Sequence, residues 1–220
     1  MLVSIKHEFV LISMPKCAST STEAALARRS DVRLGSHPKL KHSSLRDYKE
    51  YILPLLRFKL GDDEEKWEII SLFRHPIAWL NSWYRFRLRE AEAGQPSDLR
   101  SFTTGLTFEE FLERYANSLE GPVRFGRQID RILDVDGNVG KITLFRYEDY
   151  DAFLQYLSKK MNQRIEPKKL NVSPTDPTDI SAYQHFVDHP KIAADWAVYR
   201  TIGVESGISG SATDPIEGRR

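Results

Sequence analysis

The pattern of apolar and polar positions divides the chain into short apolar runs, which alternate with longer amphipathic segments. Continuous apolar runs of strand length occur at 9–14, 67–73 and 142–146. Helix-forming sequence follows each of them, at 20–29, 77–93 and 149–161. Strands that alternate with helices predict an α/β fold: a three-layer arrangement of a parallel sheet with helices on both faces.

Weaker patterns predict the remaining elements. Segment 44–60 is helical in composition, and Pro54 is expected to bend or split it. Thr107 and Glu110 have the spacing of a capping box at a helix start, as do Thr20 and Glu23. The segment 124–133 is expected to be helical, and two short helices are expected after a polar loop at 171–178.

Composition and charge narrow the functional classes. The 220 residues fit one domain, expected at 1–206, and the polar stretch 207–220 is expected to be a disordered tail. A net charge of +1 argues against a nucleic-acid partner. Cys17 is the only cysteine, so no intrachain disulfide can form, which favours a cytoplasmic location. No apolar stretch has the length of a membrane span, and no signal peptide is expected.

The stretch "PKCASTS" at 15–21, called the anion loop below, joins the first predicted strand to the first predicted helix. A helix N-terminus carries unpaired N–H groups and a partial positive charge, which together attract anions. Lys16 precedes the turn, and five hydroxyl or thiol side chains lie between Cys17 and Thr22. The glycine-rich Walker pattern is absent. An alternative interpretation is a hydroxyl-rich helix cap with an exposed lysine.

A second strand, turn and helix offers another set of anion donors. Arg74 follows the strand at 67–73, Pro76 lies in the first helical turn, and Ser82 comes eight residues after Arg74, about two helical turns on. A guanidinium is a forked, permanently charged donor. Arg74 and Ser82 are therefore expected to reach one bound phosphate. Alternatively, Arg74 pairs with a carboxylate and Ser82 merely lies on the helix.

Together these two motifs resemble the nucleotide-binding signature of the sulfotransferase superfamily, whose donor is 3′-phosphoadenosine 5′-phosphosulfate. In that family a Pro-Lys-x-x-[ST]-[ST] loop holds the 5′-phosphosulfate, and an Arg with a Ser eight residues on holds the 3′-phosphate. "LFRYEDYDAFLQYL" and "LNVSP" resemble later segments of the same family, so the likeness extends from about Phe9 to Val172. The resemblance implies a P-loop-like nucleotide-binding fold.

The resemblance implies which residues contact the donor. Those assigned to the phosphosulfate and the 3′-phosphate are Lys16, Cys17, Ala18, Ser19, Thr20, Ser21, Arg74 and Ser82. The Arg-Lys-Gly motif of cytosolic small-molecule sulfotransferases is missing, which makes the chain more similar to bacterial or glycan-type members. Arg85 or Arg87 is a candidate for an additional partner of the 3′-phosphate.

The implied reaction is in-line transfer of a sulfuryl group to a hydroxyl or amine of a small-molecule or glycan acceptor, with no metal required. Lys16 would stabilise charge on the leaving phosphate. The acceptor needs a base, and His42 is favoured because a helix start follows it directly. His37, Glu50 and the acidic segment 62–65 are the alternatives. The sequence identifies neither the acceptor nor the oligomeric state.

Two other functions remain open from the sequence. A nucleoside or small-molecule kinase with a degenerate phosphate loop would need a Ser or Thr after the loop lysine, where Cys17 stands. A non-catalytic nucleotide-binding module on the same fold would keep the cleft without the chemistry. Cys17 beside a lysine at a helix N-terminus could also be a reactive thiol, although packing of the loop is the preferred interpretation.

Overall fold

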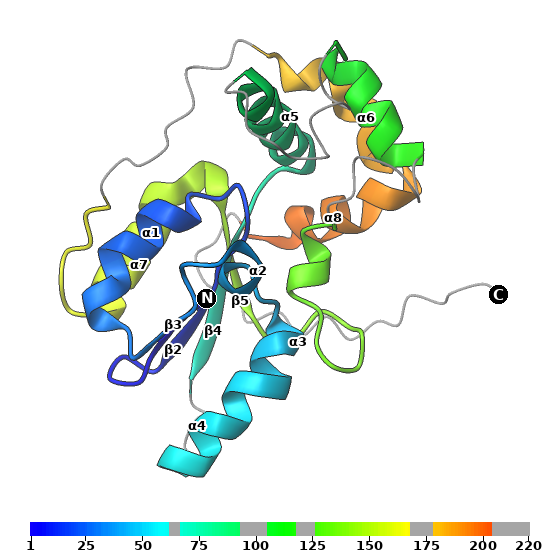
Figure 1. Cartoon of the computed structure of the whole chain (residues 1–220). Helices are drawn as coiled ribbons and strands as arrows, with labels where there is room; N and C mark the ends of the chain where they lie inside the picture. The colour runs from blue at the N-terminus through cyan, green and yellow to red at the C-terminus, as the bar shows by residue number, and fades with distance from the viewer. Residues whose placement is uncertain (62–66, 93–104, 118–125, 168–177, 204–220) are drawn as a thin grey trace.

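The computed structural model describes residues 1–61, 67–92, 105–117, 126–167 and 178–203. Its centre is a five-stranded sheet in the order β3-β1-β2-β4-β5 (Figure 1). The strands are β1 (Leu2–Ser4), β2 (Phe9–Ile12), β3 (Val32–Arg33), β4 (Glu68–Phe73) and β5 (Thr143–Arg146). The three strands predicted from the apolar runs are therefore confirmed, and β1 and β3 are additional.

The sheet is mixed, which corrects the prediction of a parallel sheet. β2, β4 and β5 run parallel, as expected for strands joined through helices. β1 pairs antiparallel with both β2 and β3. A tight turn between β1 and β2 makes this hairpin possible, with Glu8 in the left-handed region at φ 50°. The chain is therefore an α/β protein whose sheet has a parallel half and an antiparallel margin.

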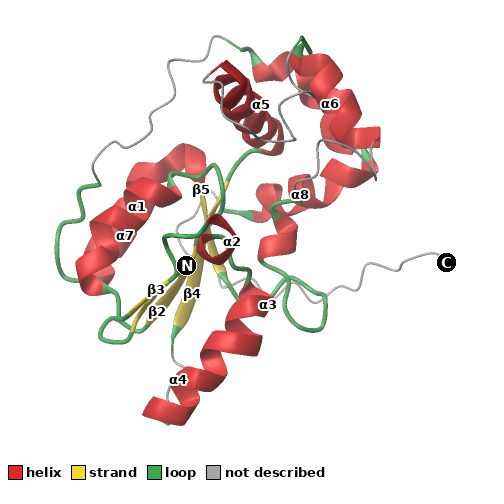
Figure 2. Cartoon of the chain, in the orientation of Figure 1, coloured by secondary structure: helices red, strands yellow, loops and turns green. Residues whose placement is uncertain are grey.

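Helices lie on both faces of the sheet (Figure 2). The α-helices are α1 (Ser19–Leu26), α2 (Pro38–Lys41), α3 (Leu45–Asp47), α4 (Leu53–Leu60), α5 (Pro76–Glu92), α6 (Phe108–Asn117), α7 (Tyr150–Lys160) and α8 (Pro190–Thr201). Segments of 3₁₀ helix occupy Ala27–Arg29, Ile129–Arg131, Tyr147–Asp149 and Ile180–Asp188.

Two apolar clusters follow from the alternation of side chains along the strands. Phe9 and Leu11 of β2 belong to the larger cluster, which includes Phe153 of α7 and continues to α5, α6 and α8. Val10 and Ile12 face the other way and pack with α3 and α4. Each sheet face thus has its own helical cover, and the edge at the carboxyl ends of β2, β4 and β5 is left for a site.

The predicted helix at 44–60 divides into α3, a π-helical turn at Tyr48–Ile52, and α4. Pro54 lies in the first turn of α4, where its missing N–H costs nothing, and the irregular turn comes just before it. The capping box of Thr107 and Glu110 is confirmed at the start of α6. The helix expected at 124–133 is reduced to the 3₁₀ turn Ile129–Arg131 within the described residues.

Several predictions concern segments outside the described residues: the tail at 207–220, the acidic segment 62–65 and the "LNVSP" loop. Among the helices that are described, none has the length and apolar composition needed to cross a membrane.

Candidate functional site

The carboxyl ends of the three parallel strands meet at one edge of the sheet. Ile12 of β2 lies opposite Ser71 of β4, and Phe73 of β4 lies opposite Arg146 of β5. The anion loop, Arg74 and the segment after Arg146 therefore emerge side by side. In open α/β sheets, ligands bind outside this edge. The candidate site is built here.

The anion loop leaves the N-terminus of α1 accessible to a ligand. Lys16 and Ala18 adopt left-handed backbone angles, with φ values of 62° and 51°. Ala18 is the N-cap of α1 and provides no side-chain cap. The first N–H groups of a helix have no intrahelical acceptors, so those of Ser19 and Thr20 can donate to an anion. Non-glycine residues hold such angles at a cost, and they are frequent at functional sites.

The capping box predicted for Thr20 and Glu23 does not form, which is a correction. Glu23 is buried and accepts a hydrogen bond from the Ser13 hydroxyl at 2.5 Å. Its carboxylate therefore ties α1 to the end of β2 and leaves the helix N-terminus uncapped. The reason is that the helix begins at Ser19, one residue before the predicted start, which moves Thr20 out of the N-cap position.

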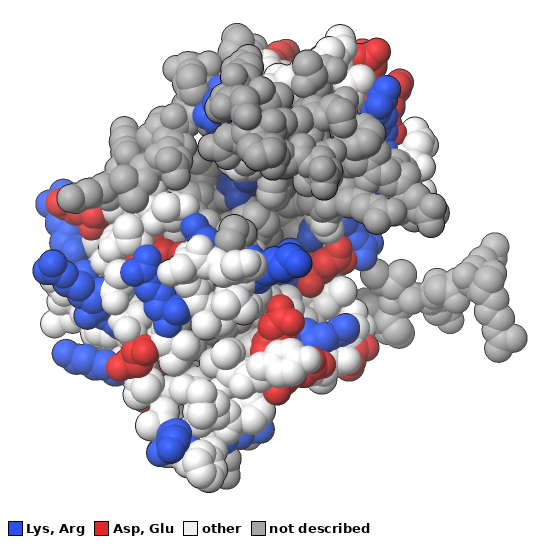
Figure 3. Space-filling model, in the orientation of Figure 1, with Lys and Arg blue, Asp and Glu red and all other residues white. Residues whose placement is uncertain are grey.

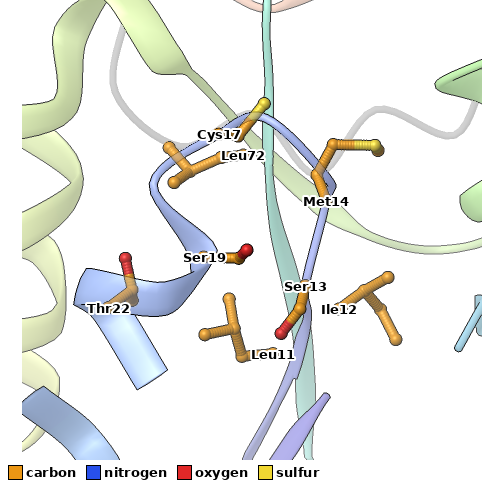
Figure 4. A pocket seen from close by; sticks show the side chains of 8 residues that line it. All are labelled: Leu11, Ile12, Ser13, Met14, Cys17, Ser19, Thr22 and Leu72. Carbon is orange, nitrogen blue, oxygen red and sulfur yellow. The ribbon is translucent and has the colours of Figure 1, made fainter. Parts of the chain in front are cut away.

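A small cavity of about 10 Å³ lies beneath the anion loop, with room for about one water molecule. Figure 4 shows its lining, with the Ser19 hydroxyl pointing from α1 toward β2. Ser13, Cys17 and Thr22 also contribute to it. A phosphate or sulfate is too large for this space.

The Lys16 side chain extends from the anion loop to α5. Its Nζ lies 3.9 Å from the centre of the Phe86 ring and 5.4 Å from that of Trp83. Both contacts are cation–π interactions. Phe86 and Trp83 are half-buried, whereas Trp79 on the same helix is buried. The aromatic face of α5 thus holds the ammonium group beside the loop.

Cys17 is a packing residue within the site. Its side chain is buried, and burial raises the pKa of the thiol despite the nearby Arg74 and Lys16. A raised thiol pKa leaves little thiolate at neutral pH. This corrects the alternative of a reactive Cys17, and the backbone is the part of this residue available to a ligand.

Arg74 lies where predicted, directly after β4, and contacts the anion loop. Its Nη1 donates to the Lys16 backbone oxygen at 3.2 Å. Its guanidinium lies 4.6 Å from the centre of the Tyr147 ring, which follows β5. Among the described residues, the buried Nε of Arg74 has no hydrogen-bond partner. Arg74 is not paired with a carboxylate through any described ion pair, and it retains donor capacity for an anion.

Ser82 and two further arginines lie on α5. Ser82 and Arg85 are half-buried. Arg87 is buried, and its guanidinium carbon lies 5.8 Å from the Trp83 ring centre. Arg87 and Lys16 therefore both contact Trp83. That Ser82 and Arg74 reach one bound phosphate stays a prediction.

His42 lies against Ser13, between the end of β2 and the anion loop. Its Nδ1 lies 2.7 Å from the Ser13 backbone oxygen. A carbonyl oxygen can only accept, so Nδ1 carries the proton and Nε2 of the neutral ring is left as a proton acceptor. Burial lowers the pKa of His42 below 6.5. The His42 backbone is fixed by Arg131, whose Nη1 donates to its carbonyl at 2.6 Å.

The alternative bases are less well placed. His37 is exposed at the start of α2, and Glu50 is exposed on the π-helical turn. Neither makes a contact with the anion loop among the described hydrogen bonds and ion pairs.

Lys41 is a site residue that sequence reasoning missed. Its Nζ donates to the Thr20 hydroxyl at 2.7 Å and lies 3.9 Å from a Glu23 oxygen. The side chain is 14% exposed, so a second ammonium group sits at the N-terminus of α1. The sequence could have indicated Lys41 by its position next to His42. A segment that brings one side chain to the site also brings its neighbour close.

Glu148 and Tyr147, from the segment after β5, were also missed as site residues. Glu148 Oε1 accepts from the His75 backbone N–H at 2.9 Å. The sequence could have indicated them through the predicted parallel pairing, because neighbouring parallel strands end at the same edge of the sheet.

In Figure 3, Lys and Arg side chains lie along the middle of the face shown, at the boundary between the sheet region and the α5–α6 region.

Within the described ranges, no three His, Cys, Asp or Glu side chains converge as metal ligands would. The expectation that no metal is required stays a prediction. Comparison with family models, with curated proteins and with solved structures gave no match.

Proposed function

We propose that the chain is a sulfotransferase with a P-loop-like nucleotide-binding fold, which uses 3′-phosphoadenosine 5′-phosphosulfate as donor. The observation that carries this proposal is the convergence of Arg74 and His42 on the connection between β2 and α1. Arg74 contacts the anion loop at the Lys16 carbonyl, and His42 contacts the Ser13 carbonyl, two residues before that loop. The two side chains come from segments far apart in the sequence, and they are the anion reader and the base that such a reaction requires.

The residues present suit a donor with two anionic ends. The uncapped N-terminus of α1, together with Lys16 and Lys41, suits the 5′-phosphosulfate. Arg74, with an unpaired Nε among the described residues, suits the 3′-phosphate. Ser82 is the proposed second partner of that phosphate.

In the proposed reaction the acceptor oxygen or nitrogen attacks sulfur in line with the leaving 5′-phosphate. The new bond to sulfur forms as the bond between sulfur and the bridging oxygen breaks, which releases adenosine 3′,5′-bisphosphate. Nε2 of His42 takes the acceptor proton, as its tautomer allows. Lys16 neutralises the charge that grows on the leaving phosphate.

The test is a transfer assay with radiolabelled donor against a panel of alcohols, phenols, amines and glycans. Labelled product together with adenosine 3′,5′-bisphosphate is the expected result. Nucleotide binding without transfer to any acceptor would favour a binding module, and phosphate transfer from ATP with Mg²⁺ would favour a kinase.

A further inference from the structure

Gln128 holds the backbone of Arg74 from both sides. Its Oε1 accepts from the Arg74 N–H at 2.9 Å, and its Nε2 donates to the Arg74 carbonyl at 2.9 Å. Gln128 is fully buried. A buried amide with both ends satisfied is costly to move, because displacing it leaves unpaired polar groups behind. Arg74, which lies just beyond the end of β4, is thus paired as if the sheet continued by one more residue.

Asp195 of α8 holds Gln128 in turn. Its Oδ2 accepts from the Gln128 N–H at 3.1 Å and its Oδ1 from the Ile129 N–H at 2.8 Å. Asp195 is 3% exposed. It therefore caps the 3₁₀ turn Ile129–Arg131 and holds the backbone of Gln128, from which the Gln128 side chain extends.

These contacts form a continuous series from α8 to the site. Asp195 orients Gln128, Gln128 orients the Arg74 backbone, and Arg74 Nη1 reaches the Lys16 carbonyl at 3.2 Å. The guanidinium is thus attached at its backbone by one buried side chain and at its tip by the anion loop. A small rotation of the Arg74 backbone would displace the guanidinium by a larger distance, because the side chain is long.

We infer that Gln128 and Asp195 are positioning residues, which fix the Arg74 guanidinium and thereby set the preference of the site for a nucleotide that carries a 3′-phosphate. This inference rests on the proposed function, in which Arg74 reads that phosphate. Both side chains are buried and bond to backbone groups, so they would act on the ligand only through Arg74. A purely stabilising role would change the melting temperature but would leave the relative affinity for two nucleotides unchanged.

The test compares the full chain with its Gln128→Met variant, which keeps side-chain length and loses both hydrogen bonds. Titration calorimetry with adenosine 3′,5′-bisphosphate and with adenosine 5′-phosphate gives a ratio of affinities. We expect this ratio to fall about tenfold, the scale of one charge-assisted contact. Affinity for adenosine 5′-phosphate should change by less than about twofold. The control is Gln155→Met, the same change at an exposed position of α7, which should leave the ratio intact.

Asp195→Asn provides a second variant should Gln128→Met fail to fold. It retains one carbonyl oxygen for the two backbone N–H groups, and we expect the ratio to fall about threefold. An unchanged ratio in a folded variant of either kind would overturn the inference.

Amide hydrogen exchange at Arg74 in the ligand-free protein separates this inference from the proposed function. Faster exchange at Arg74 in Gln128→Met, with unchanged exchange at Ile70 within β4, would support the positioning role even if the wild-type chain bound neither nucleotide. Unchanged exchange at Arg74 would overturn the positioning role. Failure of the wild-type chain to prefer the 3′-phosphate would count against the proposed function instead.

Discussion

Two units of strand, turn and helix form the candidate site, and they hold their charged groups differently. In the first unit, β2 leads through the anion loop to α1. Its donors are backbone N–H groups of an uncapped helix, and the ammonium of Lys16 rests on aromatic rings of another helix. In the second unit, β4 leads to α5, and the donor beside the anion loop is the guanidinium of Arg74, whose backbone is held by Gln128.

The difference suggests a division of tasks. The cation of the first unit, Lys16, lies on aromatic rings of α5. In the proposed reaction it would neutralise the charge that grows on the leaving phosphate. The second unit fixes its cation, which suits recognition of a group that does not react. We therefore expect substitutions in the first unit to change the rate, and substitutions in the second unit to change nucleotide preference.

The largest expected effect is that of Lys16→Met. Loss of the cation at the leaving oxygen should lower turnover by about 100- to 1000-fold and also weaken donor binding. Steady-state kinetics with saturating acceptor measures both. Lys16→Arg, which keeps the charge, should retain more activity. Full turnover and full donor affinity in Lys16→Met would show that Lys16 takes no part in the transfer reaction.

His42→Ala should lower turnover by roughly 100-fold, the usual scale for a general base, while donor affinity stays nearly intact. Its matched control is His37→Ala at the exposed start of α2, which should have little effect. Normal turnover in His42→Ala on a true acceptor would disprove its assignment as the base, and a loss in His37→Ala would identify the replacement.

The pH dependence of turnover provides a separate test of His42. Burial lowers its pKa, so the neutral base persists to a lower pH than for a free histidine. The acidic limb of the rate profile should therefore have its midpoint below 6.5, and the limb should disappear in His42→Ala. A limb above that value would point to a different group.

Arg74→Ala should weaken binding of adenosine 3′,5′-bisphosphate by roughly 10- to 100-fold, since a hydrogen bond to a charged group contributes about 1.5–3 kcal/mol. Affinity for adenosine 5′-phosphate should barely change, and calorimetry measures both. Equal losses for the two nucleotides would show that Arg74 does not read the 3′ group, and the proposed division between the units would fail.

The smallest expected effect is that of Ser82→Ala. A neutral hydroxyl contributes about 0.5–1.5 kcal/mol, so binding of the 3′-phosphate nucleotide should weaken by roughly two- to tenfold. Ser82→Thr, which keeps the hydroxyl, is the control. If Arg85→Ala or Arg87→Ala lowers the 3′-phosphate preference while Ser82→Ala does not, the second partner of the phosphate is an arginine of α5.

The sequence predicted the parallel half of the sheet because its strands are long apolar runs. β1 and β3 were missed because each is very short, at 3 and 2 residues, and periodicity needs longer segments. The confirmed capping box of Thr107 and Glu110 depends on local spacing alone. The one predicted at Thr20 and Glu23 does not form, because α1 begins at Ser19 and the Glu23 carboxylate accepts from Ser13 instead.

Residues of the candidate site were predictable where a motif is contiguous, as for Lys16 and Arg74. Gln128 could not be predicted, because its partner Arg74 is 54 positions away in the chain and their pairing depends on where the 3₁₀ turn at Ile129–Arg131 lies. The tautomer of His42 likewise depends on a contact with Ser13, 29 positions away. Contacts of this kind are set by tertiary packing and leave no local pattern.

The central claim is that the site binds a nucleotide through its 3′-phosphate. The most direct measurement is calorimetric titration of the wild-type chain with adenosine 3′,5′-bisphosphate and, separately, with ATP and Mg²⁺. The account predicts that the bisphosphate binds about tenfold more tightly or better, since Arg74 contributes only when a 3′-phosphate is present. Equal binding, or tighter binding of ATP with Mg²⁺, would contradict it.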